Sequence, residues 1–425
     1  MLNTINRAPN IPLRHKIVIL WGLCLLFITQ VPVLEVSLPG IFLRYLILAG
    51  AVMLLIVNLP RILPSLGLFE VSVIGYFILA ITISSAAGIW SGFPPDLVTF
   101  IKFLILNVFI YFIARSLDSK RSIEIFLHIY YLLALISAFQ GIMALVADYW
   151  GIRQLGVIPI TDGGLDSAPY SLTWYGLLGG DVGNFRTNFF FSESSYFAHF
   201  LFPAIGYALA KEKRVGLFVL IAGLLSSFSA AALIALVGFL SLWSLRFLKL
   251  RSMLCFFIGI VVITAPLAMY FTQNESVYLL LTDRTYSIND KMYTYQVAFQ
   301  WLLEHPLGSG LIDTDDYFGL AVNTSGGLFN YIIWFGWLAW PFVFMVTGSL
   351  LVTGLIARHD HLYSGMALSM FFLCVASISH GPLIKYYMVF FLGLCASYWS
   401  IRCGRYSGNA KANVLFPQRT SSLVK

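Results

Sequence analysis

The chain has 425 residues, of which 59% are hydrophobic and only 11% are charged, and its formal net charge is +7. Soluble proteins carry about 25% charged residues, so this composition excludes a water-soluble fold and predicts a polytopic integral membrane protein. The chain also lacks a hydrophilic stretch long enough for a separate catalytic domain, which excludes enzymes whose soluble domain binds a nucleotide donor.

Apolar stretches predict an all-α fold with about twelve transmembrane helices, because about 20 helical residues are needed to cross a bilayer core. Arg7, Arg14 and Lys16 precede the first stretch and no small-residue cleavage site follows it, so we expect a retained first helix. The predicted helices cover residues 17–34, 41–57, 68–90, 97–114, 123–147, 189–210, 215–229, 231–247, 252–272, 328–355, 362–379 and 383–400.

The stretch from Val215 to Leu245 is long for one membrane span and just long enough for two short ones. Basic residues flank it, with Lys211 and Arg214 before it and Arg246 after it. Because basic residues favour the cytoplasm, both ends are expected there, and we predict two short helices with a break at Ser226–Ser229. With a cytoplasmic N-terminus, roughly 19 of the 26 Lys and Arg residues fall on cytoplasmic segments.

Two outer loops are long, at residues 148–188 and 273–327, whereas the cytoplasmic loops are short. Long ordered loops commonly carry function, so we expect the working face on the periplasmic side. An enzyme on that side meets no nucleotide sugar, and an activated donor such as a lipid-linked pyrophosphate has to arrive from the membrane. The loops divide the chain into helices 1–5 (1–147), the first loop, helices 6–9 (189–272), the second loop with an interfacial helix, helices 10–12 (328–400) and a cytoplasmic tail (401–425).

The end of the first long loop carries Arg186, immediately before a predicted helix whose N-terminus faces outward. A guanidinium and the free N–H groups of that helix end would together bind an anion at the membrane surface. Glu193, about one turn inside, is a candidate general base, because burial near the bilayer raises the pKa of a carboxyl group. The alternatives are an arginine that reaches lipid headgroups and a structural ion pair between the two residues. His199 on the same helix is expected to be a core histidine.

In the second long loop, Arg284 precedes the capping-box pattern of residues 287–290, which predicts a helix that ends at Glu304. Apolar residues on this helix follow helical spacing at Met292, Tyr295, Phe299 and Leu302. Tyr293 and Trp301 are residue types that suit a membrane interface. We therefore expect the helix to lie along the membrane surface and to hold Arg284 over a groove. A helix that merely covers the bundle would have the same pattern.

Lys102 and Lys385 lie about one turn inside the outward ends of helices, where a charge either lines a polar cavity or reaches headgroups. Asp313, Asp315 and Asp316 do not complete a calcium-binding pattern and are expected to be solvated. The cysteines form no CxxC pair. We therefore expect neither a metal site nor a disulfide framework.

Three segments resemble a known family. The run Arg186-Thr-Asn-Phe-Phe-Phe-Ser-Glu-Ser-Ser-Tyr-Phe-Ala resembles the Arg…Phe-Phe-x-Glu-Pro-Ser-x-Phe-Ala segment of bacterial O-antigen and exopolysaccharide polymerases of the Wzy type. Arg284, Trp301 and the run His305-Pro306-Leu307-Gly308-Ser309-Gly310 resemble the Arg…Trp…His-Pro-Leu-x-Gly-x-Gly pattern that these polymerases share with O-antigen ligases. The segment from Asn323 through Leu328 to Phe335-Gly336 resembles the loop-to-helix segment that follows. Ser194 stands in place of the usual Pro, and Asn323 stands near where ligases carry a His.

The resemblance implies a metal-independent, inverting transfer, without a cofactor, between two undecaprenyl-pyrophosphate-linked saccharides on the periplasmic side of the bacterial inner membrane. It implies that Arg186 and Arg284 stabilise the departing pyrophosphate by roughly a few kcal/mol each. Glu193 or His305 is the candidate general base, and a loop carboxylate is a further one. The expected substrate-binding residues are Arg186, Arg284, Lys102, Lys385, Tyr196, Tyr293 and Asn323.

The expected partners are the lipid-linked oligosaccharide and the bilayer, with a chain-length regulator and a flippase as further candidates, and no nucleic acid. Two other functions stay open. An O-antigen ligase would transfer the glycan to lipid A core, and the missing His at Asn323 argues against it. A flippase for the same lipid-linked sugar would be expected to show inverted repeats, which we do not find clearly in the sequence.

Overall fold

The computed structural model of the chain describes residues 11–28, 38–103, 108–149, 194–227, 230–244, 293–312, 314–318, 328–379 and 386–404. Regular structure within these residues is helical throughout, which confirms the predicted all-α fold. The helices are α1 (Leu13–Ile28), α3 (Leu38–Ile62), η2 (Leu63–Ser65), α4 (Leu68–Trp90), α5 (Leu97–Phe103), α6 (Ile110–Arg115), α7 (Lys120–Tyr149), α9 (Ser194–Ala210), α10 (Arg214–Ser226), α11 (Ala230–Ser244), α14 (Thr314–Phe318), α16 (Phe329–Phe335), η4 (Gly336–Leu338), α17 (Ala339–Ile356), α18 (His361–Ser379) and α19 (Tyr386–Arg402). Residues 293–304 form a further helix.

A helix overlaps every predicted range except 252–272, which lies outside the described residues. Among the described residues, 3 helical stretches are long and apolar enough to cross a membrane: Leu68–Trp90, Lys120–Met143 and Phe329–Ile356. Other apolar helices, α10 and α11 among them, are shorter. The helices are thus compatible with a membrane protein, while the number of crossings stays a prediction.

The predicted break between two short helices is confirmed, because α10 ends at Ser226 and α11 begins at Ala230. Serine side chains explain the helix end. Ser226 Oγ donates a hydrogen bond to the Gly223 carbonyl at 2.7 Å, and Ser227 Oγ donates one to the Leu224 carbonyl at 2.6 Å, in competition with helical N–H groups. With 13 and 15 residues, the two helices are each about 20 Å long, whereas a bilayer core is about 30 Å thick. Over these residues each helix is shorter than a bilayer core, and whether the pair makes two crossings stays a prediction.

Helix α9 lies at the centre of the larger of two hydrophobic clusters. Every side chain on it from Phe197 to Ala208 is buried, because α7, α10, α11 and α18 surround it. Its close crossing with α18 depends on small residues, since a Cβ added at Gly206 would lie 2.5 Å from the carbonyl oxygen of Gly365. His199 is only 1% exposed, as the sequence predicts for a core histidine.

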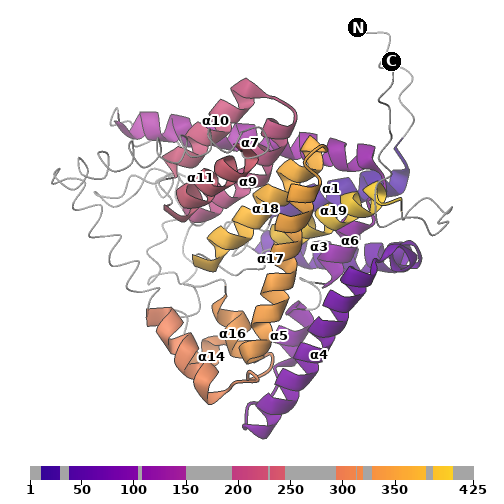
Figure 1. Cartoon of the computed structure of the whole chain (residues 1–425), viewed down its shortest axis with the longest axis vertical. Coiled ribbons are helices and arrows are strands. Elements are labelled where there is room, and N and C mark those ends of the chain that lie inside the picture. Colours follow the sequence, from indigo (N-terminus) through magenta and orange to yellow (C-terminus); the bar gives the residue numbers. More distant parts are fainter. Residues whose placement is uncertain are drawn as a thin grey trace, which may run out of the picture.

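The smaller hydrophobic cluster joins α4, α5, α16 and the segment of residues 298–312. Three phenylalanine rings connect these elements, with centroid distances of 5.3 Å between Phe77 and Phe103 and 5.9 Å between Phe77 and Phe335. In Figure 1, α14, α16 and the C-terminal end of α4 lie at the bottom, below the helices of the larger cluster. This cluster supports the part of the second long loop that the structure describes.

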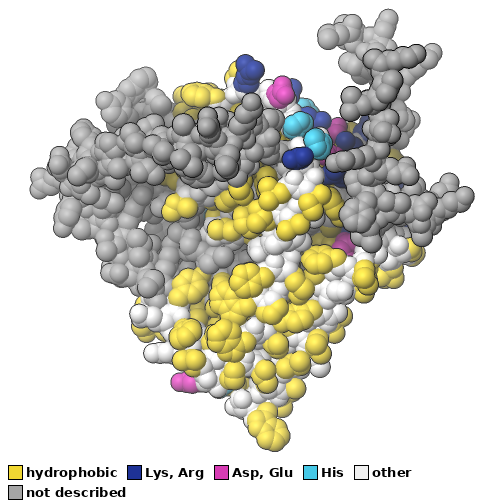
Figure 2. All heavy atoms as spheres, in the orientation of Figure 1, with side chains coloured by type: hydrophobic (Ala, Val, Ile, Leu, Met, Phe, Trp, Pro, Cys, Tyr) yellow, Lys and Arg dark blue, Asp and Glu magenta, His cyan; other side chains and the backbone are white. Residues whose placement is uncertain are grey.

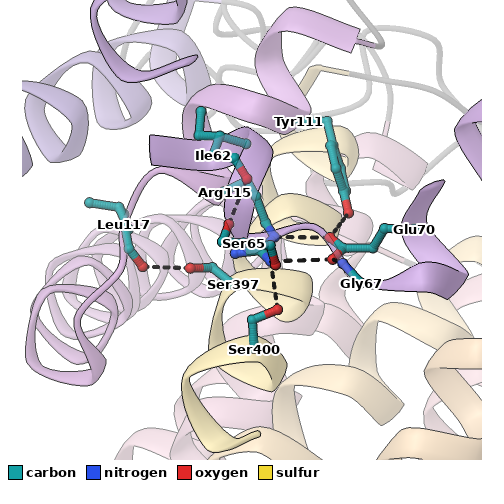
Figure 3. Close-up of polar contacts among 9 residues, drawn as sticks. All are labelled: Ile62, Ser65, Gly67, Glu70, Tyr111, Arg115, Leu117, Ser397 and Ser400. Carbon is teal, nitrogen blue, oxygen red and sulfur yellow. Dashed lines mark hydrogen bonds and ion pairs between the residues drawn. The ribbon is translucent and has the colours of Figure 1, made fainter. Parts of the chain in front are cut away.

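The N-terminal end of α4 is fixed by a buried ion pair (Figure 3). Arg115, whose side chain is fully buried, donates from Nε to Glu70 Oε1 at 2.9 Å. The same guanidinium donates to the Ser65 carbonyl at 2.9 Å and to Ser400 Oγ at 2.5 Å. The Tyr111 hydroxyl also donates to Glu70 Oε1, at 2.8 Å. These bonds connect η2, α4, α6 and α19, and they satisfy both charges of the pair.

Basic side chains gather at the same end of the helices, which we call the basic end. It carries Arg14, Lys120, Lys211, Arg358 and Arg402. Contacts between elements join it, including Arg14 with Asp118 at 2.7 Å and Lys211 with Glu124 at 3.5 Å. Figure 2 shows charged and histidine side chains at the upper edge of the described surface, above a broad apolar area. Helices α7 and α9 therefore run in opposite directions, as the charge pattern predicts.

Candidate functional site at the His305 to Gly310 junction

The structure describes only part of the predicted site. Arg186, Glu193, Arg284, Asn323 and Lys385 lie outside the described residues, so the predicted convergence of the two arginines stays a prediction. Tyr196 lies on the first turn of α9, and Lys102 lies on α5. The ring of Phe103, next to Lys102 in the chain, lies 5.5 Å from the ring of Trp334, which places α5 against α16. His305 and Tyr293 are described with their side chains.

The helix of residues 293–304 buries one face against the smaller hydrophobic cluster. Thr294, Ala298 and Leu302 are buried, with exposures of 1%, 0% and 1%. Phe299, which shares the predicted apolar face with Leu302, is 54% exposed, and the predicted position of this face on a membrane surface stays a prediction. Apolar residues occur on two faces of this helix, and periodicity alone does not choose between them. The small side chains of Thr294 and Ala298 allow the closer approach to the smaller hydrophobic cluster.

Trp301 is partly buried and packs against the smaller hydrophobic cluster, while its predicted place at a membrane interface stays a prediction. Its Nε1 donates a hydrogen bond to Ser309 Oγ at 2.7 Å. Its ring centroid lies 4.4 Å from that of His305 and 4.9 Å from that of Phe318. Tyr293, by contrast, is 58% exposed at the start of the same helix. Trp301 therefore connects the helix to the loop that follows it.

Residues 305–312, together with residues 333–337, form a unit that we call the junction. Helix α16 ends at Phe335, so the carbonyls of its last turn lack partners within the helix. Ser309 N–H donates to the Ile333 carbonyl at 3.0 Å, and Gly310 N–H donates to the Trp334 carbonyl at 3.1 Å. In return, Trp337 N–H donates to the Pro306 carbonyl at 2.9 Å. The loop therefore caps α16 and connects it to η4 and α17.

Glycines make this close approach possible. Gly308 has φ +83° and Gly336 has φ +56°, conformations that L side chains rarely adopt. A Cβ added at Gly336 would lie 2.3 Å from the Pro306 carbonyl oxygen. On the other side of the loop, a Cβ added at Gly88 of α4 would lie 2.1 Å from the Ser309 carbonyl oxygen. The run of residues 305–310 therefore packs backbone to backbone between α4 and the break at Gly336.

The imidazole of His305 lies half-buried among aromatic rings at this junction. Trp301 is on one side, and the Phe93 ring meets the imidazole edge to face, with a centroid distance of 5.1 Å and an interplanar angle of 89°. Tyr317 lies 5.5 Å from Phe93 and is 45% exposed. The His305 backbone is also held, because its N–H donates to the Trp301 carbonyl at 2.7 Å. An imidazole fixed in this way is suited to transfer a proton or to orient a polar ligand.

Further polar contacts tie the surrounding segments to the junction. Burial raises the pKa of Tyr295 to about 12, and its hydroxyl group is hydrogen-bonded to the backbone of Leu328, just before α16. Asp96 N–H donates to the Leu311 carbonyl at 3.1 Å, while Asp96 Oδ2 accepts from Thr99 N–H at 2.9 Å and so caps α5. The junction thus holds the start of α5, and Tyr295 of the preceding helix holds the start of α16.

Sequence reasoning does not point to Gly88, Phe93 or Asp96 as part of this site. A capping residue before an apolar run is the only signal for Asp96, and it predicts a helix start without naming a tertiary partner. Gly88 and Phe93 have no distinguishing pattern, because the segment they contact is far away in the chain. Neither a protein-family model nor a curated protein matches this chain.

Proposed function

We propose that this protein is a polysaccharide polymerase of the bacterial inner membrane, a glycosyltransferase. It would move a growing glycan from undecaprenyl pyrophosphate to an incoming lipid-linked repeat unit. The observation that supports this most is the junction itself. Trp301, the run from His305 to Gly310 and Gly336 carry two of the resemblances, and they are joined by hydrogen bonds and close backbone contacts. If the short patterns matched by chance, their residues would not be expected to contact one another in the structure.

The proposed orientation places the basic end in the cytoplasm and the junction on the periplasmic side. Basic residues favour the cytoplasmic side of a membrane protein, which supports the first placement. Helix α4 joins the two ends, and its 23 residues span roughly 34 Å, enough to cross a bilayer core. Large apolar side chains are exposed along it, including Leu68 at 83% and Ile78 at 59%, as expected of a helix that faces lipid. About twelve spans and two long periplasmic loops complete the proposed topology.

In the proposed reaction, a hydroxyl of the incoming sugar attacks the anomeric carbon of the donor glycan from the side opposite the pyrophosphate. The new C–O bond forms as the old one breaks, and the lipid pyrophosphate leaves with the bonding electrons, which inverts the anomeric configuration. Arg186 and Arg284 would stabilise the charge that gathers on the leaving group, by roughly a few kcal/mol each. The hydroxyl proton would pass to Glu193 or to His305. Neither a metal ion nor a cofactor takes part in this proposal.

A flippase is the second candidate, because transporters often contain broken helices. The break at Gly336 does not support it strongly. Helix α16 has 7 residues, so the break lies about 10 Å from the start of the apolar stretch rather than at its midpoint. The loop of residues 305–310 also fills this break. The separation between α10 and α11 is the observation that favours a flippase, because it resembles a broken helix.

Deletion of the gene, followed by gel analysis of surface glycan, separates the candidate functions. A polymerase predicts a surface glycan with a single repeat unit. A ligase predicts that lipid A carries no repeat unit at all, and a flippase predicts that the lipid-linked repeat accumulates in the cytoplasmic leaflet. Either of the last two results would contradict the proposal.

Complementation with point variants then tests the arginines. We expect Arg284→Ala to abolish long-chain polymer while membrane insertion stays normal, because its charge is needed only by the substrate. Arg153→Ala, in the other long loop and outside the motifs, is the matched control and should keep the polymer. Glu193→Gln should lose activity and still bind the lipid-linked substrate. Wild-type polymer in the Arg284 variant would contradict the enzyme assignment.

A further inference from the structure

A polar cavity of about 440 Å³ opens at the basic end, which is the end of α4 remote from the junction. Helix ends and one turn build it. The charged and histidine side chains that line it are Lys120 and Glu124 at the start of α7, Lys211 after α9, His359, Asp360 and His361 at the turn into α18, and Arg402 at the end of α19. Segments far apart in the sequence thus bring cations together around one space.

The two carboxylates of the cavity, Glu124 and Asp360, lie too far from the lysines to form short hydrogen bonds with them, so the lysine N–H groups can still bind an anion. Lys120 Nζ lies 3.9 Å from Asp360 Oδ2, and Lys211 Nζ lies 3.5 Å from Glu124 Oε1. Both distances exceed the roughly 2.7–2.9 Å of a charge-assisted hydrogen bond. Asp360 is already engaged as a cap, because its Oδ1 accepts from the Tyr363 N–H at 3.2 Å. The cavity therefore has three cations and two loosely paired carboxylates.

Aromatic rings lie beside two of the cations. Lys120 Nζ lies 5.4 Å from the centroid of the Tyr398 ring, and the Arg402 guanidinium lies 5.5 Å from that of Trp399. Such contacts hold a cation without neutralising its charge. Helices α7 and α18 also begin at the cavity, and the N-terminus of a helix carries a partial positive charge. Two imidazoles, of His359 and His361, add hydrogen-bonding groups at the rim.

We propose that this cavity binds a phosphate group, carried either by an anionic lipid headgroup or by a soluble phosphate compound. Basic residues at cytoplasmic helix ends are common in membrane proteins, so their presence alone does not indicate a site. The arrangement does, because the cations converge on a cavity that is large enough for a phosphate with a substituent. Arg121 and Lys213 show the contrast, since they are exposed on the same elements and do not line the cavity. The proposal is independent of the transferase activity.

A matched pair of double variants tests this site in the full-length protein. Lys120→Gln with Lys211→Gln removes two charges that line the cavity. Arg121→Gln with Lys213→Gln removes two charges from the same elements outside it. Binding is measured as thermal stabilisation of the purified protein in nanodiscs, with increasing inorganic phosphate in phosphatidylcholine discs and, separately, with increasing phosphatidylglycerol in the discs.

We expect one phosphate source to stabilise the wild type, with at least tenfold weaker apparent affinity in the cavity variant and less than a twofold change in the control. Stabilisation by inorganic phosphate would identify a soluble ligand, whereas stabilisation by phosphatidylglycerol alone would identify a headgroup. Equal weakening in both variants, or no stabilisation from either source, would overturn the proposal. If the cavity variant misfolds, Arg402→Gln, which changes one exposed side chain, is measured in its place. These binding measurements do not depend on the transferase activity, so the result for the Arg284 variant does not affect them.

Discussion

The two ends of α4 are anchored by different chemistry. At its C-terminal end, Gly88 allows the helix to touch the Ser309 backbone, and the loop there caps α16 through main-chain hydrogen bonds. At its N-terminal end, the buried pair of Glu70 and Arg115 holds η2, α6 and α19 (Figure 3). A backbone contact fails when atoms are added, whereas an ion pair fails when a partner is removed. The ends should therefore respond to opposite kinds of substitution.

The largest effect is expected at the ion pair. Arg115→Met leaves Glu70 buried without its cation and breaks the bonds to Ser65 and Ser400, so we expect a loss of about 3–5 kcal/mol in the free energy of unfolding. Arg121→Met, which changes an exposed cation of α7, is the control and should have little effect. Thermal unfolding of the detergent-purified variants measures both. Equal stability of the two variants would contradict the structural role of the pair.

An added methyl group at the junction should come next. Gly336→Ala places a Cβ 2.3 Å from the Pro306 carbonyl oxygen at a residue with φ +56°, and we expect a loss of about 3 kcal/mol. Gly348→Ala in α17 has no atom within 4 Å of the added carbon and should be neutral or slightly stabilising. The yield of folded protein from membranes and its melting temperature report the difference. A tolerated Gly336→Ala would show that the close backbone contact is unimportant.

A third prediction separates the chemistry of the junction from its architecture. If His305 is the general base, His305→Gln should lower the transfer rate about 100-fold, while the melting temperature stays unchanged. His359→Gln at the basic end is the control and should keep the wild-type transfer rate. A wild-type transfer rate in the His305 variant would assign the base to another residue, with Glu193 as the next candidate.

The smallest effect is expected from a single hydrogen bond of the junction. Trp301→Phe removes the bond from Nε1 to Ser309 Oγ and leaves a ring in place, so a loss of about 1 kcal/mol is expected. Trp340→Phe removes a buried ring N–H that has no partner among the described residues, and it should be neutral or stabilising. Chemical denaturation of both variants gives the comparison. A larger loss of unfolding free energy in the Trp340 variant than in the Trp301 variant would contradict the stabilising role of the Trp301 hydrogen bond.

Much of the helical layout could be predicted from the sequence. The all-α class, the ranges of the described helices and the break at Ser226 follow from the lengths of apolar stretches and from the basic residues that flank them. Charge also predicted that the helix ends around Lys120, Lys211 and Arg402 would lie on one side of the protein, and these residues line one cavity. These features depend on residues close together in the chain or on a shared preference for one side of a membrane, and a sequence records both directly.

Only the tertiary structure decided which face of the helix at residues 293–304 is buried, and it placed Trp301 and His305 beside Phe93. It also explained why Gly88 of α4 and Gly336 are glycines, since another backbone approaches each of them closely. Such contacts join segments that are distant in the chain, and each segment alone is compatible with several partners. Helix positions were therefore a property of the sequence, whereas the junction and the cavity arose from the packing of the helices.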